Sequence, residues 1–216
     1  MRNDRTVDRC RLCSGIAEGL AYLHGKGIAS TIPHSSLNIG PNTIILNLGA
    51  WRSQGGDAQL TDFGNAILVD GLLRFTERGS TRSKLSTRWA APEQLKGEVT
   101  YTVEADIHSL GMAEWSTHAT FCAQETTSSQ LPYADIKLEY AVALGIIEGR
   151  RPKRPENTIP TGSEQGNMLW FLFEACWRQD PSERPTAPFV VEVVSIRQSL
   201  DSVLKFMSSL DQEDQA

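Results

Sequence analysis

The feature that most constrains this chain is the segment from Ala58 to Glu93, because a short motif fixes each of its ends. The segment opens with Asp-Phe-Gly at residues 62–64 and closes with Ala-Pro-Glu at residues 91–93. The residues between are rich in Ser, Thr and Arg and show no hydrophobic period, which is typical of a loop. Asp62 follows a short apolar run, so we expect its carboxylate at a strand end, where it could bind a hard cation.

These two motifs, in this order and with Arg88-Trp89 directly before the second, resemble the activation segment of a protein kinase. The Arg-Trp pair is more similar to the tyrosine-kinase-like and tyrosine kinase groups than to most other serine/threonine kinases. The resemblance covers about residues 8–205. It implies that Asp62 is the metal-binding Asp of the family.

A helix is predicted from about residue 8 to His24, because apolar residues recur there at helical spacing: Leu12, Ile16, Leu20 and Leu23. Its second half resembles the helix that precedes the catalytic loop of kinases. No G-x-G-x-x-G loop comes before it, and the earliest lysine is Lys26. We therefore expect a mainly α fold with a few short β-strands (α+β). It would correspond to the large C-terminal lobe of a kinase, with the small β-rich lobe missing.

The catalytic loop implied by the resemblance falls on residues 34–42. His34 keeps the place of the His in the family's His-x-Asp motif, but Ser36 stands where the catalytic Asp is due. No Asp or Glu occurs between Lys26 and Asp57, so no small realignment restores the carboxylate. That Asp orients the attacking hydroxyl and accepts its proton, whereas a serine hydroxyl is uncharged near neutral pH. Ser36 is therefore not expected to act as the base.

The resemblance implies Mg and ATP as cofactors, with Mg²⁺ held by Asp62 and by an Asn such as Asn42. Asn42 falls one position later than the family pattern requires. No residue of the chain matches the strand lysine that grips the nucleotide in the family, or the helix glutamate that pairs with it; we call these two residues the nucleotide clamp. Binding of the nucleotide is therefore in doubt.

Hydroxyl residues lie among basic residues within the 58–93 segment, and the candidate phosphorylation positions are Ser80, Thr81, Ser86 and Thr87. A phosphate on one of them could pair with the arginines of the segment, which are Arg78, Arg82 and Arg88. Hydroxyl residues are also common in any exposed loop, and the two interpretations stay open.

Glu93, Asp106 and Arg184 are interpreted as structural anchors. Thr102 fits an N-cap, and the helix that it would open resembles the central buried helix of the large lobe. The resemblance implies that Asp106 in that helix holds the catalytic loop. The string Cys-Trp-x-x-Asp-Pro-x-x-Arg-Pro at residues 176–185 resembles another family landmark. It implies a buried ion pair between Arg184 and Glu93.

The kinase-like domain is predicted to span residues 1–207. Its remaining helices are expected at residues 138–148, with Leu138, Val142 and Ile146 on one stripe, at 168–177 and at 189–206. Residues 208–216 read as an acidic, frayed tail.

Two stretches, residues 29–57 and 114–130, depart from the family pattern. In the second, polar and β-branched residues replace the aliphatic residues that should continue the buried central helix, so helix there is doubtful.

Composition excludes several classes of partner. The formal net charge is −5, which offers no general attraction to nucleic acid or to an anionic membrane. No apolar stretch is long enough to span a bilayer and the N-terminus is polar, so a cytoplasmic, intracellular setting is expected. Cys10 and Cys13 form a C-x-x-C pair, which a helix face explains better than a metal site.

The resemblance implies transfer of the γ-phosphate of ATP to Ser, Thr or Tyr hydroxyls of a protein substrate. With Ser36 at the base position and the nucleotide clamp missing, we expect the chain to be inactive or nearly so. The alternatives left open are a pseudokinase-like module that binds a partner protein, and a non-functional product of a truncated gene.

Overall fold

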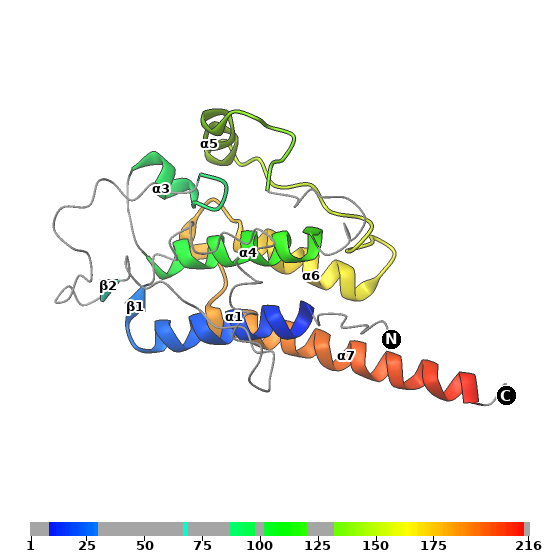
Figure 1. The fold of residues 1–216 in the computed structure, drawn as a ribbon. Coiled ribbons are helices and arrows are strands. Elements are labelled where there is room, and N and C mark those ends of the chain that lie inside the picture. Colours follow the sequence, from blue (N-terminus) through cyan, green and yellow to red (C-terminus); the bar gives the residue numbers. More distant parts are fainter. Residues whose placement is uncertain (1–8, 30–66, 69–86, 98–101, 121–131, 214–216) are drawn as a thin grey trace, which may run out of the picture.

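The computed structural model describes residues 9–29, 67–68, 87–97, 102–120 and 132–213, and these are mainly helical (Figure 1). The elements in chain order are α1 (Arg9–Gly25), β1 (Ile28–Ala29), β2 (Ile67–Leu68), α3 (Pro92–Lys96), α4 (Val103–Thr120), α5 (Glu139–Ile147), α6 (Glu164–Cys176), the 3₁₀ helix η3 (Pro181–Glu183) and α7 (Ala187–Glu213). β1 and β2 pair antiparallel. The predicted fold class is thus confirmed. Within these residues no helix is long and apolar enough to cross a membrane.

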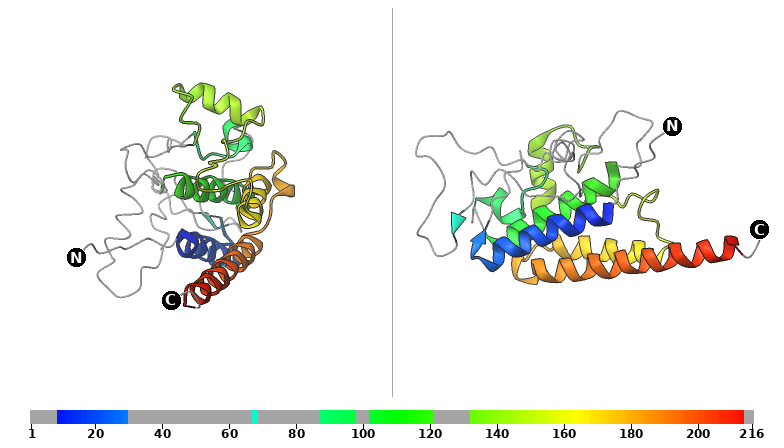
Figure 2. Two further views of the ribbon diagram at one scale, coloured as in Figure 1. Left: turned by 90° about the vertical axis from the view of Figure 1, so that its right-hand side faces the viewer. Right: turned by 60° about the horizontal axis from the view of Figure 1, so that its bottom comes forward.

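The core is built around α4. Helices α1 and α6 pack against it, and α7 lies along α1 and α6 (Figures 1 and 2). Every residue of α4 from Ala105 to Ser116 is buried. A helix surrounded on all sides needs apolar residues around its whole circumference. The largest fully buried side chains of α4 and of the helices packed on it include Leu20, Ile107, Leu110, Met112, Leu169, Leu172, Phe173 and Trp177.

Gly111 allows the close approach of α4 and α6. A Cβ atom at this position would lie 2.7 Å from Cβ of Cys176 and 2.9 Å from Nε1 of Trp177. Both are shorter than van der Waals contact, and Cys176 belongs to a packed helix. Only glycine therefore fits this crossing without moving α6.

The predicted first helix is confirmed as α1, which ends at Gly25. Ile16, Leu20 and Leu23 are all buried, as their spacing indicated. Burial of this stripe against α4 and α7 is what stabilises a helix of this length. Cys10 and Cys13 both belong to α1, in agreement with the prediction that they lie in a helix.

The predicted break of the central helix at Glu114 is wrong, because α4 continues to Thr120. The polar residues are accommodated by internal hydrogen bonds. Ser116 Oγ donates to the carbonyl of Met112 at 2.9 Å, and Trp115 Nε1 donates to the carbonyl of Lys153 at 3.0 Å. A buried hydroxyl that bonds within its own helix avoids most of the cost of desolvation. Residues 121–130 of the same stretch lie outside the described part.

Three helix boundaries differ from the prediction. Leu138 precedes α5 as its N-cap and is 55 % exposed, so only Val142 and Ile146 of the expected stripe are buried. Helix α6 begins at Glu164 because the Ser163 side chain accepts a hydrogen bond from the N–H of Gly166. Helix α7 runs from Ala187 to Glu213, so most of the expected frayed tail is helical backbone.

Candidate functional site

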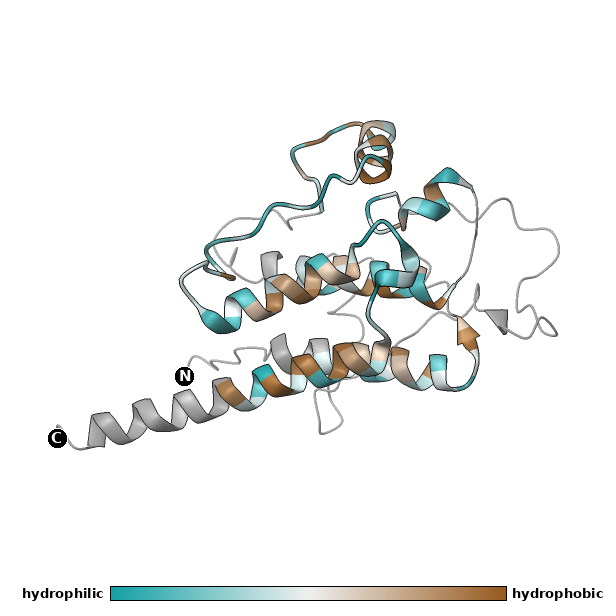
Figure 3. Ribbon diagram, turned by 180° about the vertical axis from the view of Figure 1, so that it is seen from behind, coloured by the Kyte–Doolittle hydropathy of each residue, from teal (hydrophilic) through white to brown (hydrophobic). Residues whose placement is uncertain are grey.

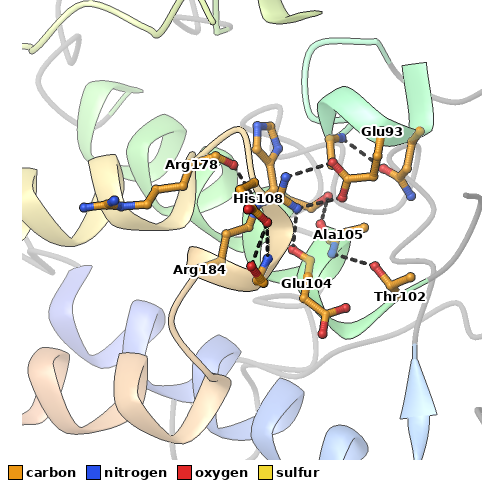
Figure 4. Close-up of polar contacts among 12 residues, drawn as sticks. Glu93, Thr102, Glu104, Ala105, His108, Arg178 and Arg184 are labelled. Atoms are coloured by element: carbon orange, nitrogen blue, oxygen red, sulfur yellow. Dashed lines mark hydrogen bonds and ion pairs between the residues drawn. The ribbon is translucent and has the colours of Figure 1, made fainter. Parts of the chain in front are cut away.

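The Ala-Pro-Glu motif forms the start of α3. Pro92 occupies its first turn, where a missing N–H costs nothing. The side chain of Gln94 accepts a hydrogen bond from the N–H of Ala91 at 3.0 Å. Gly97 ends the helix with φ 77°, a conformation that favours glycine. This short, doubly capped helix fixes Glu93, whose side chain is turned into the protein (Figure 4).

Glu93 and Arg184 form the buried ion pair that the resemblance implies. The two terminal nitrogens of Arg184 donate to the two carboxylate oxygens of Glu93 at 2.7 and 2.8 Å (Figure 4). Such a two-pronged contact fixes the orientation of both groups. The side chain of Arg184 is 0 % exposed and that of Glu93 is 8 % exposed.

Arg184 also joins the connection after α6 to the start of α4. Its Nε donates to the carbonyl of Arg178 at 2.9 Å, and a terminal nitrogen donates to the carbonyl of Glu104 at 2.9 Å (Figure 4). One guanidinium therefore ties α3, α4 and the α6–η3 connection together. Because its donors face carboxylate and carbonyl oxygens, the buried positive charge is well solvated by the protein.

The residues before α3 are held by α4. Ser109 Oγ donates to the carbonyl of Trp89 at 3.1 Å, and His108 Nδ1 lies 3.4 Å from the same oxygen. His108 is 1 % exposed, which agrees with the prediction of a packed histidine. The closing end of the 58–93 segment is therefore seated on the central helix.

Asp106 is 4 % exposed, and its Oδ2 lies 3.0 Å from Nε2 of His24 near the end of α1. The sequence reasoning missed His24 as a partner, because nothing in the spacing links residues 82 positions apart. The contact joins α1 to the first turn of α4. The catalytic loop, the partner that the resemblance implies for Asp106, lies outside the described residues.

Arg88 is the second residue whose role the sequence did not reveal. It is buried, with Nε donating to Glu139 at 2.9 Å and one terminal nitrogen donating to the carbonyls of Pro132 and Tyr133 at 2.7 and 2.8 Å. The other terminal nitrogen donates to the carbonyl of Ile136 at 2.9 Å. The donors of Arg88 thus already hold the loop before α5, and Arg78 and Arg82, the other arginines that could pair with a phosphate, lie outside the described residues. A charge directly before the apolar run at residues 89–91 was the available signal.

We expect Arg88→Lys to lower the free energy of unfolding by about 2–3 kcal/mol, because an ammonium cannot reach all of these acceptors and leaves buried carbonyls unbonded. Urea unfolding followed by far-UV circular dichroism measures the change. Glu139→Gln is the matched control. Glu139 is 58 % exposed, so loss of its charge should cost less than about 1 kcal/mol. Equal effects of the two variants would contradict this role for the guanidinium.

The other predicted site residues lie outside the described part of the chain: His34, Ser36, Asn42, Asp62, Ser80, Thr81 and Ser86. Thr87 is described; it is half-buried and directly precedes Arg88. Within the described residues no group of His, Cys, Asp and Glu could hold a metal ion. The fit of Mg²⁺ and ATP to the chain therefore depends on residues beyond those the structure describes.

Residues 150–155, between α5 and α6, form a basic stretch that makes local contacts. Arg154 donates to the carbonyls of Ile159 and Pro160 at 2.7 and 2.9 Å, and its guanidinium lies 5.7 Å from the ring centroid of Trp170. Lys153 pairs with Asp135 at 3.4 Å. Arg154 thus fastens this stretch to residues 159 and 160 and to Trp170, whereas the Lys153–Asp135 pair is largely exposed and contributes little.

Comparison with known proteins finds relatives whose sequences match most of the chain. The sequence model of the family "protein tyrosine and serine/threonine kinase" matches residues 2–194. The chain is 28 % identical over 185 residues to "Serine/threonine/tyrosine-protein kinase HT1" of Arabidopsis thaliana, covering 85 % of this chain and 38 % of that protein. It is also 28 % identical to "Mitogen-activated protein kinase kinase kinase 7" of Drosophila melanogaster, covering 82 % of this chain and 22 % of the relative.

A match to "Vascular endothelial growth factor receptor 3" of Danio rerio is 27 % identical and covers 66 % of this chain but 9 % of the receptor. The chain thus spans well under half the length of these curated relatives.

Proposed function

This chain belongs to the protein tyrosine and serine/threonine kinase family, and we propose that it is a catalytically impaired member that acts by binding a partner protein. A kinase transfers the γ-phosphoryl group of Mg-bound ATP to a protein hydroxyl, and the proteins that it acts on are its natural partners. In an impaired member the same large-lobe surface would bind a protein without phosphorylating it.

Ser36 is the observation that carries this proposal. Its position in the sequence is that of the family's catalytic base, and no carboxylate lies between Lys26 and Asp57 to replace it. General base catalysis contributes about 10²–10⁴-fold to a rate, and a neutral hydroxyl supplies little of it. Asp62 and Asn42 remain as the residues that would hold Mg²⁺, which would neutralise charge on the transferred phosphate.

The buried anchors support the second half of the proposal. The Glu93–Arg184 pair and the Arg88 contacts hold α3, α4 and α5 in fixed relation. Buried charges of this kind are costly unless every partner is in place. The chain therefore keeps the buried contacts that would hold a protein-binding surface in shape. It lacks the catalytic carboxylate that phosphate transfer requires.

A phosphotransfer assay with labelled ATP, Mg²⁺ and casein tests the proposal. We expect the purified chain to transfer no more phosphate than its Asp62→Ala variant, because the base is absent in both. Transfer that is clearly above that background and lost in Asp62→Ala would contradict it. Ser36→Asp, with Ser35→Asp as the matched control, then tests the assignment: a gain in rate only for Ser36→Asp assigns the loss to that position.

A further inference from the structure

Helix α5 is bordered by two residues in the left-handed backbone conformation. Tyr133 precedes the helix with φ 58°, and Gly149 follows it with φ 88°. Tyr133 is the one non-glycine residue with a positive φ in the part of the chain that the structure describes. For a bulky side chain this conformation is strained, and it persists only where the surrounding contacts enforce it. A change of backbone conformation would relieve strain at Tyr133 and meet little steric resistance at Gly149.

A hydrogen bond joins the two ends of this stretch. The phenol of Tyr133 donates to the carbonyl of Arg150 at 2.9 Å, across 17 positions of the sequence. Residues 133–150 therefore form a closed loop that contains α5, and we call this loop the α5 flap. Because its two ends are tied to each other, the flap is suited to move as one unit.

Helix α5 is apolar around much of its circumference but buries only part of that surface. Figure 3 shows it as a mainly hydrophobic helix at the edge of the molecule, beside α3. Two of its large side chains are buried, Val142 and Ile146. Three others are more than half exposed, namely Leu138 at the N-cap, Tyr140 and Leu144. A helix of nine residues is too short to be stable by itself, so α5 depends on the contacts that attach it to the rest of the molecule.

Arg88 provides several of these contacts from outside the flap. Its terminal nitrogens donate to the carbonyls of Tyr133 and Ile136 at 2.8 and 2.9 Å, and its Nε donates to Glu139 at 2.9 Å. The neighbouring Trp89 is held by α4, through the hydrogen bond to its carbonyl. The guanidinium therefore connects the start of the flap to a fixed part of the fold. Since the Arg88 side chain is only 10 % exposed, loss of these acceptors would leave a nearly buried charge poorly solvated.

We propose that the α5 flap is hinged at Tyr133 and Gly149, is latched by Arg88, and opens while the helices around α4 stay folded. Opening breaks the bonds from Arg88 to the flap, together with a bond of 3.0 Å from Gln179 Nε2 to the carbonyl of Ile146. It also exposes the two buried side chains of α5, and it relieves the strain at Tyr133.

The latch couples the flap to the closing end of the 58–93 segment, because Arg88 belongs to that segment. A change that withdraws the guanidinium from the flap favours the open form, and opening in turn frees Arg88. The coupling concerns a change of conformation, so it goes beyond the proposed function and does not depend on whether the chain transfers phosphate.

Hydrogen exchange of the full chain, followed by mass spectrometry at neutral pH, tests the proposal. In the wild type we expect the backbone amides of α5 to exchange at least about tenfold faster than those of α4, because the flap opens more often than the whole fold. Arg88→Lys should speed exchange in α5 by at least about tenfold, because the closed flap then loses hydrogen bonds. Equal rates in α5 and α4 of the wild type, or unchanged exchange of α5 in Arg88→Lys, would overturn the proposal.

Ile16→Val is the matched control. Ile16 is buried in α1, so this variant weakens the whole fold mildly and the amides of α4 should exchange a few-fold faster. The amides of α5 should keep the wild-type rate, because Ile16 keeps its contacts when the flap opens. Equal acceleration of α5 and α4 would show that α5 opens only when the whole protein unfolds, which contradicts a separate flap.

Gly149→Ala covers the case in which Arg88→Lys fails to fold. A Cβ atom at this position would lie 3.8 Å from Nε2 of Gln179, which is ordinary contact, but an alanine is strained at φ 88°. The variant should therefore fold with a less stable closed flap and exchange several-fold faster in α5. Exchange of α5 at the wild-type rate would show that the backbone at this position does not change on opening, and would overturn the hinge. None of these measurements involves ATP, so their outcome is separate from that of the phosphotransfer assay.

Discussion

Arg184→Met is expected to destabilise the protein by about 3–5 kcal/mol, because it leaves the carboxylate of Glu93 buried without its counter-charge. The side chain of Arg184 is 0 % exposed, so water cannot take its place without opening the packing between α3 and α4. A loss of this size is a large part of the stability of an ordinary domain. Equilibrium urea unfolding, followed by far-UV circular dichroism, gives the difference in free energy.

The double variant Glu93→Leu/Arg184→Met separates the buried charge from the lost hydrogen bonds. Removing both charges ends the electrostatic penalty, so the double variant should be more stable than Arg184→Met alone. It should not regain wild-type stability, because the carbonyls of Arg178 and Glu104 still lose their donor.

A surface ion pair in the same connection provides the control. Arg178 and Glu183 lie 3.0 Å apart, with side chains 47 % and 54 % exposed. Glu183→Gln should therefore change the stability by less than about 1 kcal/mol. A double variant no more stable than Arg184→Met, or an Arg184→Met effect as small as that of Glu183→Gln, would show that the buried pair does not hold α3 in place.

Local patterns predicted the parts of this structure that depend on local physics. The stripe of α1 could be predicted because Ile16 and Leu20 join the apolar core, so that only the helical period of the sequence matters. Thr102 was readable as a cap because an N-cap contacts its own helix; its Oγ1 accepts a hydrogen bond from the N–H of Ala105 at 3.1 Å. The contact of Glu93 with Arg184 spans 91 positions and became predictable only through resemblance to a family.

What the sequence did not predict depends on distant contacts. In the sequence Arg88 is one of several arginines of a loop. Its buried role could not be predicted, because only the fold brings the carbonyls of residues 132, 133 and 136 to its guanidinium. The sequence indicates only that His24 lies near the end of a helix. Its contact with Asp106 arises because the fold places α4 beside that end. The break predicted at Glu114 was wrong for a related reason. Polarity was taken to exclude burial, although backbone acceptors and a shift of pKa can accommodate a polar side chain in a core.

Glu114 is the most unusual residue of that core, and its pKa makes a strong prediction. It is 1 % exposed in the middle of α4. Burial raises the pKa of its carboxyl to about 8, and the nearby charge of Arg197 on α7 only partly opposes the rise. Burial therefore favours the protonated form of this carboxyl in the folded protein at neutral pH. Cys176 on α6 also faces this region, and burial together with Glu114 raises the pKa of its thiol.

The sign of the resulting pH dependence follows from proton binding. Between pH 4.5, the ordinary value, and about pH 8, the carboxyl is ionised in the unfolded chain and protonated in the folded one. The folded state thus binds one more proton, so this group lowers stability as pH rises, by about 1.4 kcal/mol per pH unit. Over the whole interval the loss approaches about 5 kcal/mol, and above pH 8 it levels off.

Glu114→Gln should remove this dependence, because an amide has nearly the shape of the protonated carboxyl and does not ionise. We expect the variant to match the wild type near pH 4.5 and to exceed its free energy of unfolding by a few kcal/mol at pH 8. Urea unfolding of both proteins at pH 5, 6, 7 and 8 measures the difference, in which the contributions of all other groups cancel. Glu148→Gln, at an exposed glutamate, should track the wild type at every pH.

A second variant tests whether Arg197 moderates the effect. Since its charge lowers the pKa of Glu114, Arg197→Gln should move the upper end of the pH-dependent interval to still higher pH. Parallel stability curves for the wild type and Glu114→Gln would mean that Glu114 ionises in the core at its ordinary pKa. The protein around α4 would then have to solvate a full negative charge, which desolvation opposes unless a cation and several donors surround the carboxylate.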